Sequence, residues 1–209
     1  MIGGYYQSVS TPSFGHGRKY LSLQSGNYLT VPSFVAASVF TIAYRFKRVD
    51  TTNDIQFAYA ANVAPKMGFT GTDFFFRGFN NATALRKNIG YTSALNNTWC
   101  ELLVTRDSSN QVYASLNRQP YVLVGTQSGD LQFRYLGWDL ENGNQTVGAL
   151  DEVKLLTSFT PESEMVRVLD YSTQFRNDCY LYLSFERGIQ DSSRNKLAVT
   201  NAGAQVLDY

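Results

Sequence analysis

The sequence is poor in the residues that most often build metal centres and disulfide frameworks. It has one histidine and two cysteines in 209 residues, and Cys100 and Cys179 lie far apart in apolar runs. Zinc and iron bind mainly histidine and cysteine, so a site for either metal lacks ligands here. We expect two reduced thiols in or beside the core, with a disulfide as the less favoured alternative.

Charge is also scarce, because charged residues make up 17% of the chain and leave a net charge of +1. So small an excess gives no basic field that could hold a phosphate backbone, and no nucleic-acid partner is expected. No apolar run approaches the roughly 18 residues that cross a bilayer, and the first residues are neither basic nor apolar. We expect no membrane partner, and a protein made in the cytoplasm without a signal peptide.

Patterns typical of catalysis are missing as well. The single histidine, His16, lies between two glycines and gives no rigid base for a Ser-His-Asp triad. Glycosidases built on a β-sandwich place two carboxylates two residues apart on one strand. Asp139 and Glu141 have this spacing in a loop-like stretch, and Glu162 and Glu164 have it in a predicted helix. We therefore expect a protein that is not an enzyme.

Aromatic residues and short alternating segments are abundant, with 14 tyrosines and 14 phenylalanines. Val39–Phe46 alternates so that its apolar residues share one face, as in a half-buried strand. Tyr20–Leu23 and Tyr28–Val31 flank turn residues and predict a β-hairpin. The predicted strands are 20–23, 28–31, 39–46, 54–59, 74–77, 99–105, 111–116, 131–136, 151–156, 180–185 and 197–200. This pattern predicts one all-β domain, an antiparallel β-sandwich.

One short helix is predicted near residues 160–169. Thr160 is a candidate N-cap, and Pro161 fits the first turn. Met165, Val168 and Leu169 recur at helical spacing and predict one apolar stripe that docks on the sandwich.

The order of the segments resembles a known family. The matching segments are 25–32, 38–44, 98–107, 116–119, 148–156 and 159–164. In this order and spacing they resemble the laminin G-like, concanavalin A-like jelly-roll domains found in bacterial and phage proteins. The resemblance covers roughly residues 20–170 and implies an antiparallel jelly roll with one short helix.

The C-terminal part of the sequence departs from the family pattern. Family members usually begin with an apolar strand ending in Phe-Glu, a glycine and an Asp-Ser-Ser-x-Asn turn, whereas here 181–188 and 191–199 carry that pattern. We infer a circular permutation, which compact domains tolerate because their termini often lie close together. The alternative is a truncated second repeat.

Residues 1–19 then have no family equivalent, and residues 20–209 form the single domain. The glycines of this stretch, with Tyr5, Tyr6 and Phe14, suggest an N-terminal arm that could lie on another subunit. A loose tail is the alternative.

Two oxygen-rich loops are candidates for ligand binding. The loops are 107–110 and 139–144, and their oxygen atoms suit calcium, with Asp107 and Asn110 as the candidate ligands. Several relatives of this fold bind calcium at such a rim, but the resemblance does not fix which residues are ligands. The alternative is that these residues serve the turns themselves. Trp138 and Tyr135 beside the second loop are a candidate platform for a sugar. The candidate glycan-binding residues are Trp138, Tyr135, Asp139, Asn142 and Asn144. The alternative is that Trp138 caps the core.

Three further assignments concern side-chain placement. We place Trp99 in the core, and we expect the Phe74–Phe76 run to leave one ring at an interface or under a loop. Asp151 and Glu152 are adjacent, so on a regular strand they point to opposite faces, and we assign them a structural role.

We therefore expect a non-enzymatic structural or interaction module. The first hypothesis, by analogy with the family, is a virion component of a bacteriophage, such as a capsid decoration, fibre or tail protein. Its partners would be itself, as a homo-oligomer, or other virion proteins. The alternative is a lectin-like module that binds carbohydrate at a cell surface, with or without calcium.

Overall fold

A computed structural model describes residues 19–24, 26–36, 38–50, 54–59, 65–78, 83–137, 148–170, 179–186 and 188–208. The strands are β1 (Lys19–Leu23), β2 (Tyr28–Ala36), β3 (Phe40–Arg48), β4 (Asp54–Ala58), β5 (Lys66–Thr70), β6 (Asp73–Arg77), β7 (Leu85–Lys87), β8 (Cys100–Arg106), β9 (Gln111–Leu116), β10 (Val122–Thr126), β11 (Leu131–Leu136), β12 (Gly148–Leu156), β13 (Leu181–Leu183), β14 (Thr200–Ala202) and β15 (Gln205–Asp208). The helices are two 3₁₀ turns, η1 (Ser93–Leu95) and η2 (Glu162–Glu164), and α1 (Met165–Leu169).

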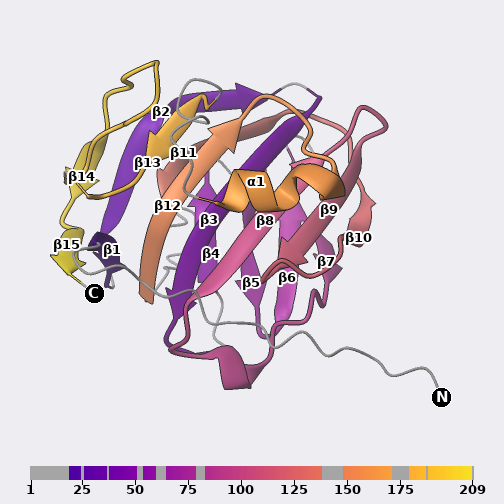
Figure 1. The fold of residues 1–209 in the computed structure, drawn as a ribbon, viewed down its shortest axis with the longest axis horizontal. Helices are drawn as coiled ribbons and strands as arrows, with labels where there is room; N and C mark the ends of the chain where they lie inside the picture. The colour runs from indigo at the N-terminus through magenta and orange to yellow at the C-terminus, as the bar shows by residue number, and fades with distance from the viewer. Residues whose placement is uncertain are drawn as a thin grey trace.

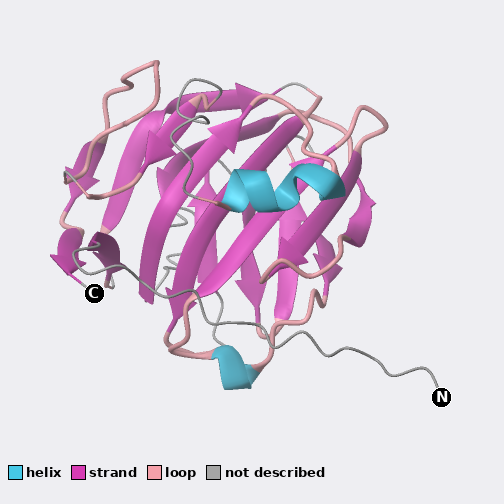
Figure 2. Cartoon of the chain, in the orientation of Figure 1, coloured by secondary structure: helices cyan, strands magenta, loops and turns pink. Residues whose placement is uncertain are grey.

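These strands form two antiparallel sheets that pack face to face (Figure 1). The large sheet has eight strands in the order β10-β9-β8-β3-β12-β1-β15, with β13 also paired to β12. The small sheet has seven strands in the order β14-β2-β11-β4-β5-β6-β7. Helix α1 lies across the outer face of the large sheet (Figure 2). The fold is the predicted all-β sandwich with one short helix.

Aromatic side chains from both sheets fill the core. The predicted apolar face of β3 is confirmed, because its aromatic residues are at most 1% exposed. Phe40 stacks on Phe76 at a ring-centroid distance of 5.7 Å, and Tyr44 meets Phe57 at 4.9 Å. Burial of one such side chain stabilises a protein by about 1.5–3 kcal/mol, so this layer is the main source of cohesion between the sheets.

The predicted hairpin of β1 and β2 is wrong, because the two strands lie in opposite sheets. β1 pairs with β12 and β15, whereas β2 pairs with β11 and β14. The turn between them closes with a hydrogen bond from the Asn27 amide to the Gln24 carbonyl (2.9 Å), and Gly26 has a φ of +92°. Two half-buried strands alternate in the same way whether they pair with each other or face each other across a core.

The C-terminal segment adds strands to both sheets. β13 pairs with β12 and β15 with β1 in the large sheet, whereas β14 pairs with β2 in the small sheet. The predicted strand over 197–200 is wrong in extent, because β14 begins only at Thr200. The circular permutation stays a prediction.

The Asp191 carboxylate organises the loop before β14. Its Oδ1 accepts the amide N–H groups of Tyr182 (3.0 Å) and Ser193 (2.8 Å). Its Oδ2 accepts the Ser193 hydroxyl (2.7 Å) and the Leu197 amide (2.8 Å). One buried side chain therefore ties β13 to the segment that leads to β14.

The helical segment follows the predicted stripe but not the predicted cap. Met165, Val168 and Leu169 are buried in one cluster with Ala43 and Leu103 of the large sheet, as predicted. The Thr160 cap is wrong: no side chain caps η2 or α1, and the Thr160 hydroxyl instead accepts a hydrogen bond from the Thr41 hydroxyl (2.9 Å). No helix in the described ranges is long and apolar enough to span a membrane.

Both cysteines are buried, and they form no disulfide with each other. Cys100 lies in the core between the sheets, and Cys179 packs in the cluster beneath α1. Burial raises the pKa of Cys100 to about 11, because the thiolate would lose its hydration. At neutral pH this thiol is therefore protonated and unreactive.

Candidate functional site

The predicted glycan-binding residues are only partly within the described structure. Trp138, Asp139, Asn142 and Asn144 lie outside the described residues. Tyr135 is described and lies in β11 of the small sheet.

Tyr135 points to the outer face of the small sheet because β11 is irregular. Strict alternation after Leu131 and Phe133 would turn Tyr135 into the core. A register shift between Phe133 and Tyr135 instead places Leu136 inward, opposite Leu29, and Tyr135 outward, opposite Thr30. At this point one residue of β11 lies opposite three residues of β2, and such an irregularity interrupts the side-chain alternation.

The Tyr135 ring belongs to a small aromatic group, which we call the small-sheet platform (Tyr28, Arg134 and Tyr135). The Tyr28 and Tyr135 rings meet edge to face at 5.8 Å and 71°. The Arg134 guanidinium carbon lies 5.8 Å from the centroid of the Tyr135 ring. Both tyrosines are partly exposed and Arg134 is exposed. Sequence reasoning missed Tyr28, which lies more than a hundred residues away in the chain and becomes a neighbour through the pairing of β2 with β11.

A second aromatic group lies on the outer face of the large sheet, and we call it the large-sheet platform (Tyr20, Lys47 and Trp99). The placement of Trp99 in the core is wrong: Cys100 takes the inward position and Trp99 is partly exposed on the outer face. The Trp99 and Tyr20 rings meet edge to face at 5.6 Å and 73°. The Lys47 Nζ lies 5.4 Å from the centroid of each ring.

The two rings of this platform meet across two intervening strands. In the large sheet, β3 and β12 lie between β8, which Trp99 precedes, and β1, which carries Tyr20. Ala149 of β12 stands opposite both Lys47 and Ser22. The small side chains of Ala149 and Ser22 leave room for the rings above them, and Ala149 is 1% exposed.

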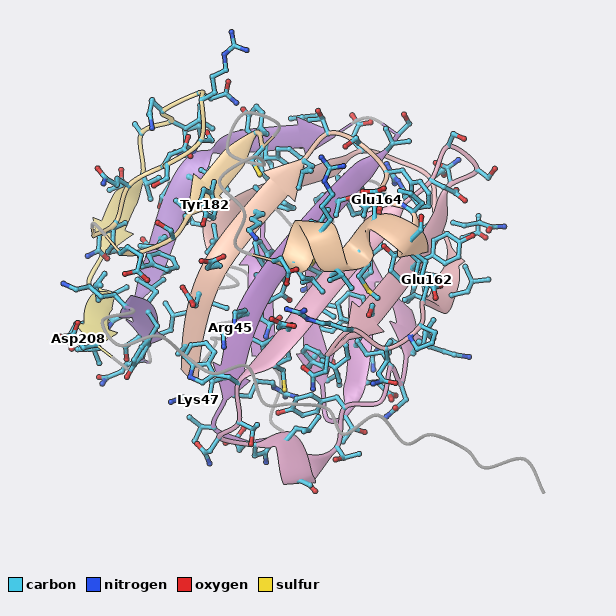
Figure 3. All side chains as sticks on the ribbon, viewed as in Figure 1. Arg45, Lys47, Glu162, Glu164, Tyr182 and Asp208 are labelled. Carbon is cyan, nitrogen blue, oxygen red and sulfur yellow. The ribbon has the colours of Figure 1, made fainter. Side chains whose placement is uncertain are left out.

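Next to the large-sheet platform, Arg45 lies beside Lys47 on the same face (Figure 3). Its NH1 pairs with Asp151 Oδ2 at 3.3 Å, and both side chains are buried. The Arg45 guanidinium carbon also lies 5.4 Å from the centroid of the Trp99 ring. The buried Arg45–Asp151 ion pair therefore holds the Arg45 guanidinium against one side of the Trp99 ring.

Asp151 and Glu152 do not point to opposite faces as predicted. A register shift follows Asp151, and Glu152 has a φ of +51°. Each carboxylate reaches a cation of the outer face: Asp151 pairs with Arg45, and Glu152 lies 3.5 Å from Lys154 Nζ. The structural role predicted for them takes the form of ion pairs.

Two further cations hold α1 on this face. The Lys154 ammonium donates to the carbonyls of Val168 (2.9 Å) and Asp170 (3.1 Å) at the end of the helix. Arg118 donates to both oxygens of Glu101 (2.7 and 3.2 Å) and pairs with the Asp170 carboxylate at 3.0 Å. The hydrogen bond to Glu101 is the main reason why the pKa of Arg118 is raised.

The calcium candidates, Asp107 and Asn110, lie in the turn between β8 and β9. Asp107 Oδ1 accepts the amide N–H groups of Ser109 (2.8 Å) and Gln111 (3.0 Å), and Asn110 has a φ of +62°. This is the geometry of an Asx turn. In the described part of the chain, no three histidine, cysteine or acidic residues group so as to hold a metal. Calcium binding at this turn stays a prediction.

The Phe74–Phe76 run divides between two sides of the small sheet. Phe74 and Phe76 are in the core, and Phe75 packs on the opposite side with Ala58 and Ala84. Phe75 is 4% exposed. The sequence left two alternatives for the outward ring, an interface or a place under a loop, and the burial of Phe75 supports the covered position.

Comparison with known proteins gives relatives in structure but not in sequence. No family model and no curated protein matches the sequence. A candidate carbohydrate-binding protein from Bacteroides ovatus superposes with a TM-score of 0.72 at 14% identity, over 92% of this chain and 60% of the other. The heptameric SAP-like pentraxin of Limulus polyphemus superposes with a TM-score of 0.65 at 10% identity, over 94% of this chain and 97% of the other. The extracellular region of zebrafish Gpr126/Adgrg6 superposes with a TM-score of 0.60 at 15% identity, over 92% of this chain and 26% of the other.

The chain thus spans less than two thirds of the Bacteroides protein, about a quarter of the zebrafish protein and nearly all of the pentraxin. At these identities the likeness concerns the fold. Together with the two antiparallel sheets, it shows that the chain has the concanavalin A-like, laminin G-like jelly-roll fold.

Proposed function

We propose that the protein is a non-enzymatic, lectin-like module that binds carbohydrate through the small-sheet platform. The observation that carries the proposal is the pair of partly exposed rings of Tyr28 and Tyr135, with the exposed Arg134 beside them. Aromatic rings pack against the C–H faces of sugars, and a neighbouring guanidinium donates hydrogen bonds to hydroxyl groups. The likeness to the Bacteroides candidate carbohydrate-binding protein supports the same class of ligand.

A glycan array probed with the full chain tests this proposal, followed by calorimetry with the strongest oligosaccharide. We expect Tyr135→Ala and Tyr28→Ala each to weaken binding at least tenfold, with a melting temperature close to that of the wild type. Tyr113→Ala is the matched control, because Tyr113 is a partly exposed tyrosine on the other sheet. Binding that survives both platform substitutions, or no glycan binding at all, would overturn the proposal. Turnover of the bound oligosaccharide would overturn its non-enzymatic part.

We also propose, as a second role, that the module belongs to a virion component that self-associates. The observation that favours association is the edge strand β15, which carries Leu207 with 39% of its surface exposed and pairs with β1. Exposed edge strands are templates for pairing with another chain. Light scattering on the full chain is the test: a closed oligomer that Leu207→Lys dissociates supports the role, and a monomer contradicts it. Light scattering on a chain that lacks residues 1–18, which keeps Lys19 because β1 begins there, shows whether the predicted arm contributes to self-association.

A further inference from the structure

We infer that the large-sheet platform is a second binding site, and that its ligand is a sugar ring carrying a carboxylate. The site consists of the rings of Trp99 and Tyr20 with the ammonium group of Lys47 beside both. It lies on the opposite side of the sandwich from the small-sheet platform. The inference does not depend on the function proposed above, because the two sites share no residue.

Lys47 differs from the other cations of this face. Arg45 pairs with Asp151, Arg118 with Glu101, and Lys154 with Glu152. Within the described ranges, Lys47 has no carboxylate partner, and its contacts are the two aromatic rings. An ammonium group carries three N–H donors, and an aromatic face satisfies them only weakly. A ligand carboxylate would supply the missing charge-assisted hydrogen bond.

The rings give the ligand a surface that is already in place. Trp99 and Tyr20 remain partly exposed, and the edge-to-face contact at 5.6 Å sets the angle between them. The buried Arg45–Asp151 pair holds the guanidinium of Arg45 5.4 Å from the centre of the Trp99 ring. A surface whose side chains are fixed before binding loses less entropy when the ligand arrives.

The local charge favours one anionic substituent on a sugar rather than a polyanion. The whole chain has a net charge of +1, so no broad positive field would concentrate a nucleic acid. In the described part of this face, Arg45, Arg118 and Lys154 pair with carboxylates, which leaves Lys47 as the cation available to a ligand. Two rings and one cation match a sugar ring with one acidic group.

The test compares galacturonosyl-rhamnose, a disaccharide with a single carboxylate, with its methyl ester, which has the same rings without the charge, by calorimetry on the full chain. We expect the acid to bind at least tenfold more tightly than the ester. Lys47→Gln should reduce this preference to within about twofold, because the carboxylate then lacks its cation, and Lys47→Arg should keep most of it. Lys87→Gln is the matched control, since Lys87 is an exposed lysine on β7 of the small sheet.

Trp99→Phe serves as a second variant that keeps an aromatic ring, and we expect weaker binding of both acid and ester. Equal affinity for acid and ester in the wild type would overturn the inference, as would a preference that Lys47→Gln leaves intact. Tighter binding of a disaccharide with a single sulfate than of the uronate would overturn the assignment of a carboxylate. Binding that responds to Tyr135→Ala but not to Lys47→Gln or Trp99→Phe would support the small-sheet platform and reject this one. Binding that responds to Lys47→Gln and Trp99→Phe but not to Tyr135→Ala would support the large-sheet platform and reject the small-sheet platform.

Discussion

The two outer faces of the sandwich each present an aromatic pair, but different forces hold the pairs in place. On the large sheet, Trp99 rests against Arg45, and a set of buried or half-buried ion pairs continues from there to the end of α1. On the small sheet, Tyr28 and Tyr135 meet beside one exposed arginine. We conclude that the paired charges of the large sheet are part of the folded structure, whereas Arg134, like Lys47 on the other face, is available for binding.

The largest effect should come from breaking the buried ion pair of the large sheet. Asp151→Ala removes the carboxylate that pairs with Arg45, a residue that is 3% exposed. We expect the free energy of unfolding to fall by about 3–5 kcal/mol, because an uncompensated buried charge is costly. Urea denaturation measures the loss. The double variant Arg45→Met with Asp151→Leu should recover most of it, and a loss below about 1 kcal/mol in Asp151→Ala would contradict the contrast between the faces.

A smaller effect is expected at the junction of α1 with the sheet. Lys154→Met removes the donor to the carbonyls of Val168 and Asp170 and also removes the ammonium group 3.5 Å from the Glu152 carboxylate. We expect a loss of about 2 kcal/mol, since hydrogen bonds to charged groups contribute about 1.5–3 kcal/mol each. Hydrogen exchange should accelerate in 162–170 and stay unchanged in β5 and β6. Faster exchange throughout both sheets would contradict a local role.

The core between the faces should respond to alkaline pH through Cys100. Its pKa is about 11 in the folded protein and about 9 when unperturbed. Between these values the unfolded chain loses the thiol proton while the folded chain keeps it, so stability falls as pH rises through this window. Unfolding followed from pH 8 to 11 should show this decline, and Cys100→Ala should show a shallower one. An identical decline in both proteins would assign it to other groups.

The smallest effect on stability is expected at Arg134. The side chain is exposed and its described contact is with the Tyr135 ring. We expect Arg134→Ala to change the free energy of unfolding by less than about 0.5 kcal/mol, as is usual for surface substitutions. The same variant should weaken glycan binding by the small-sheet platform several-fold. A large loss of stability would show that Arg134, like Arg45, contributes to holding the folded structure together.

The sequence was sufficient for features that depend on local periodicity. The inward face of β3 and the buried stripe of α1 follow from spacings of two and of three to four residues, and both are confirmed. The fold type followed from the order of several such segments. None of these features requires knowledge of which strands are neighbours.

Features that depend on register and bulges could not be predicted in the same way. The register shift between β11 and β2 turns Tyr135 outward, and the register shift after Asp151 brings two adjacent carboxylates to one face. Trp99 and Cys100 are both apolar, so alternation alone does not decide which of the two faces the core. The partners of Tyr135 and Trp99, which are Tyr28 and Tyr20, come from distant strands. Four of the five predicted glycan-binding residues, Trp138, Asp139, Asn142 and Asn144, lie outside the described residues, and their role stays a prediction.

The pairing of β1 also bears on how the chain folds as it is synthesised. Leu21 stands opposite Leu150, and Tyr20 opposite Leu207. A ribosome that adds about 5–20 residues per second therefore exposes β1 for many seconds before its first partner emerges. During that time its backbone groups are open to pairing with other nascent chains. Assembly of the large sheet has to wait for late synthesis, and folding dominated by such distant contacts is slow.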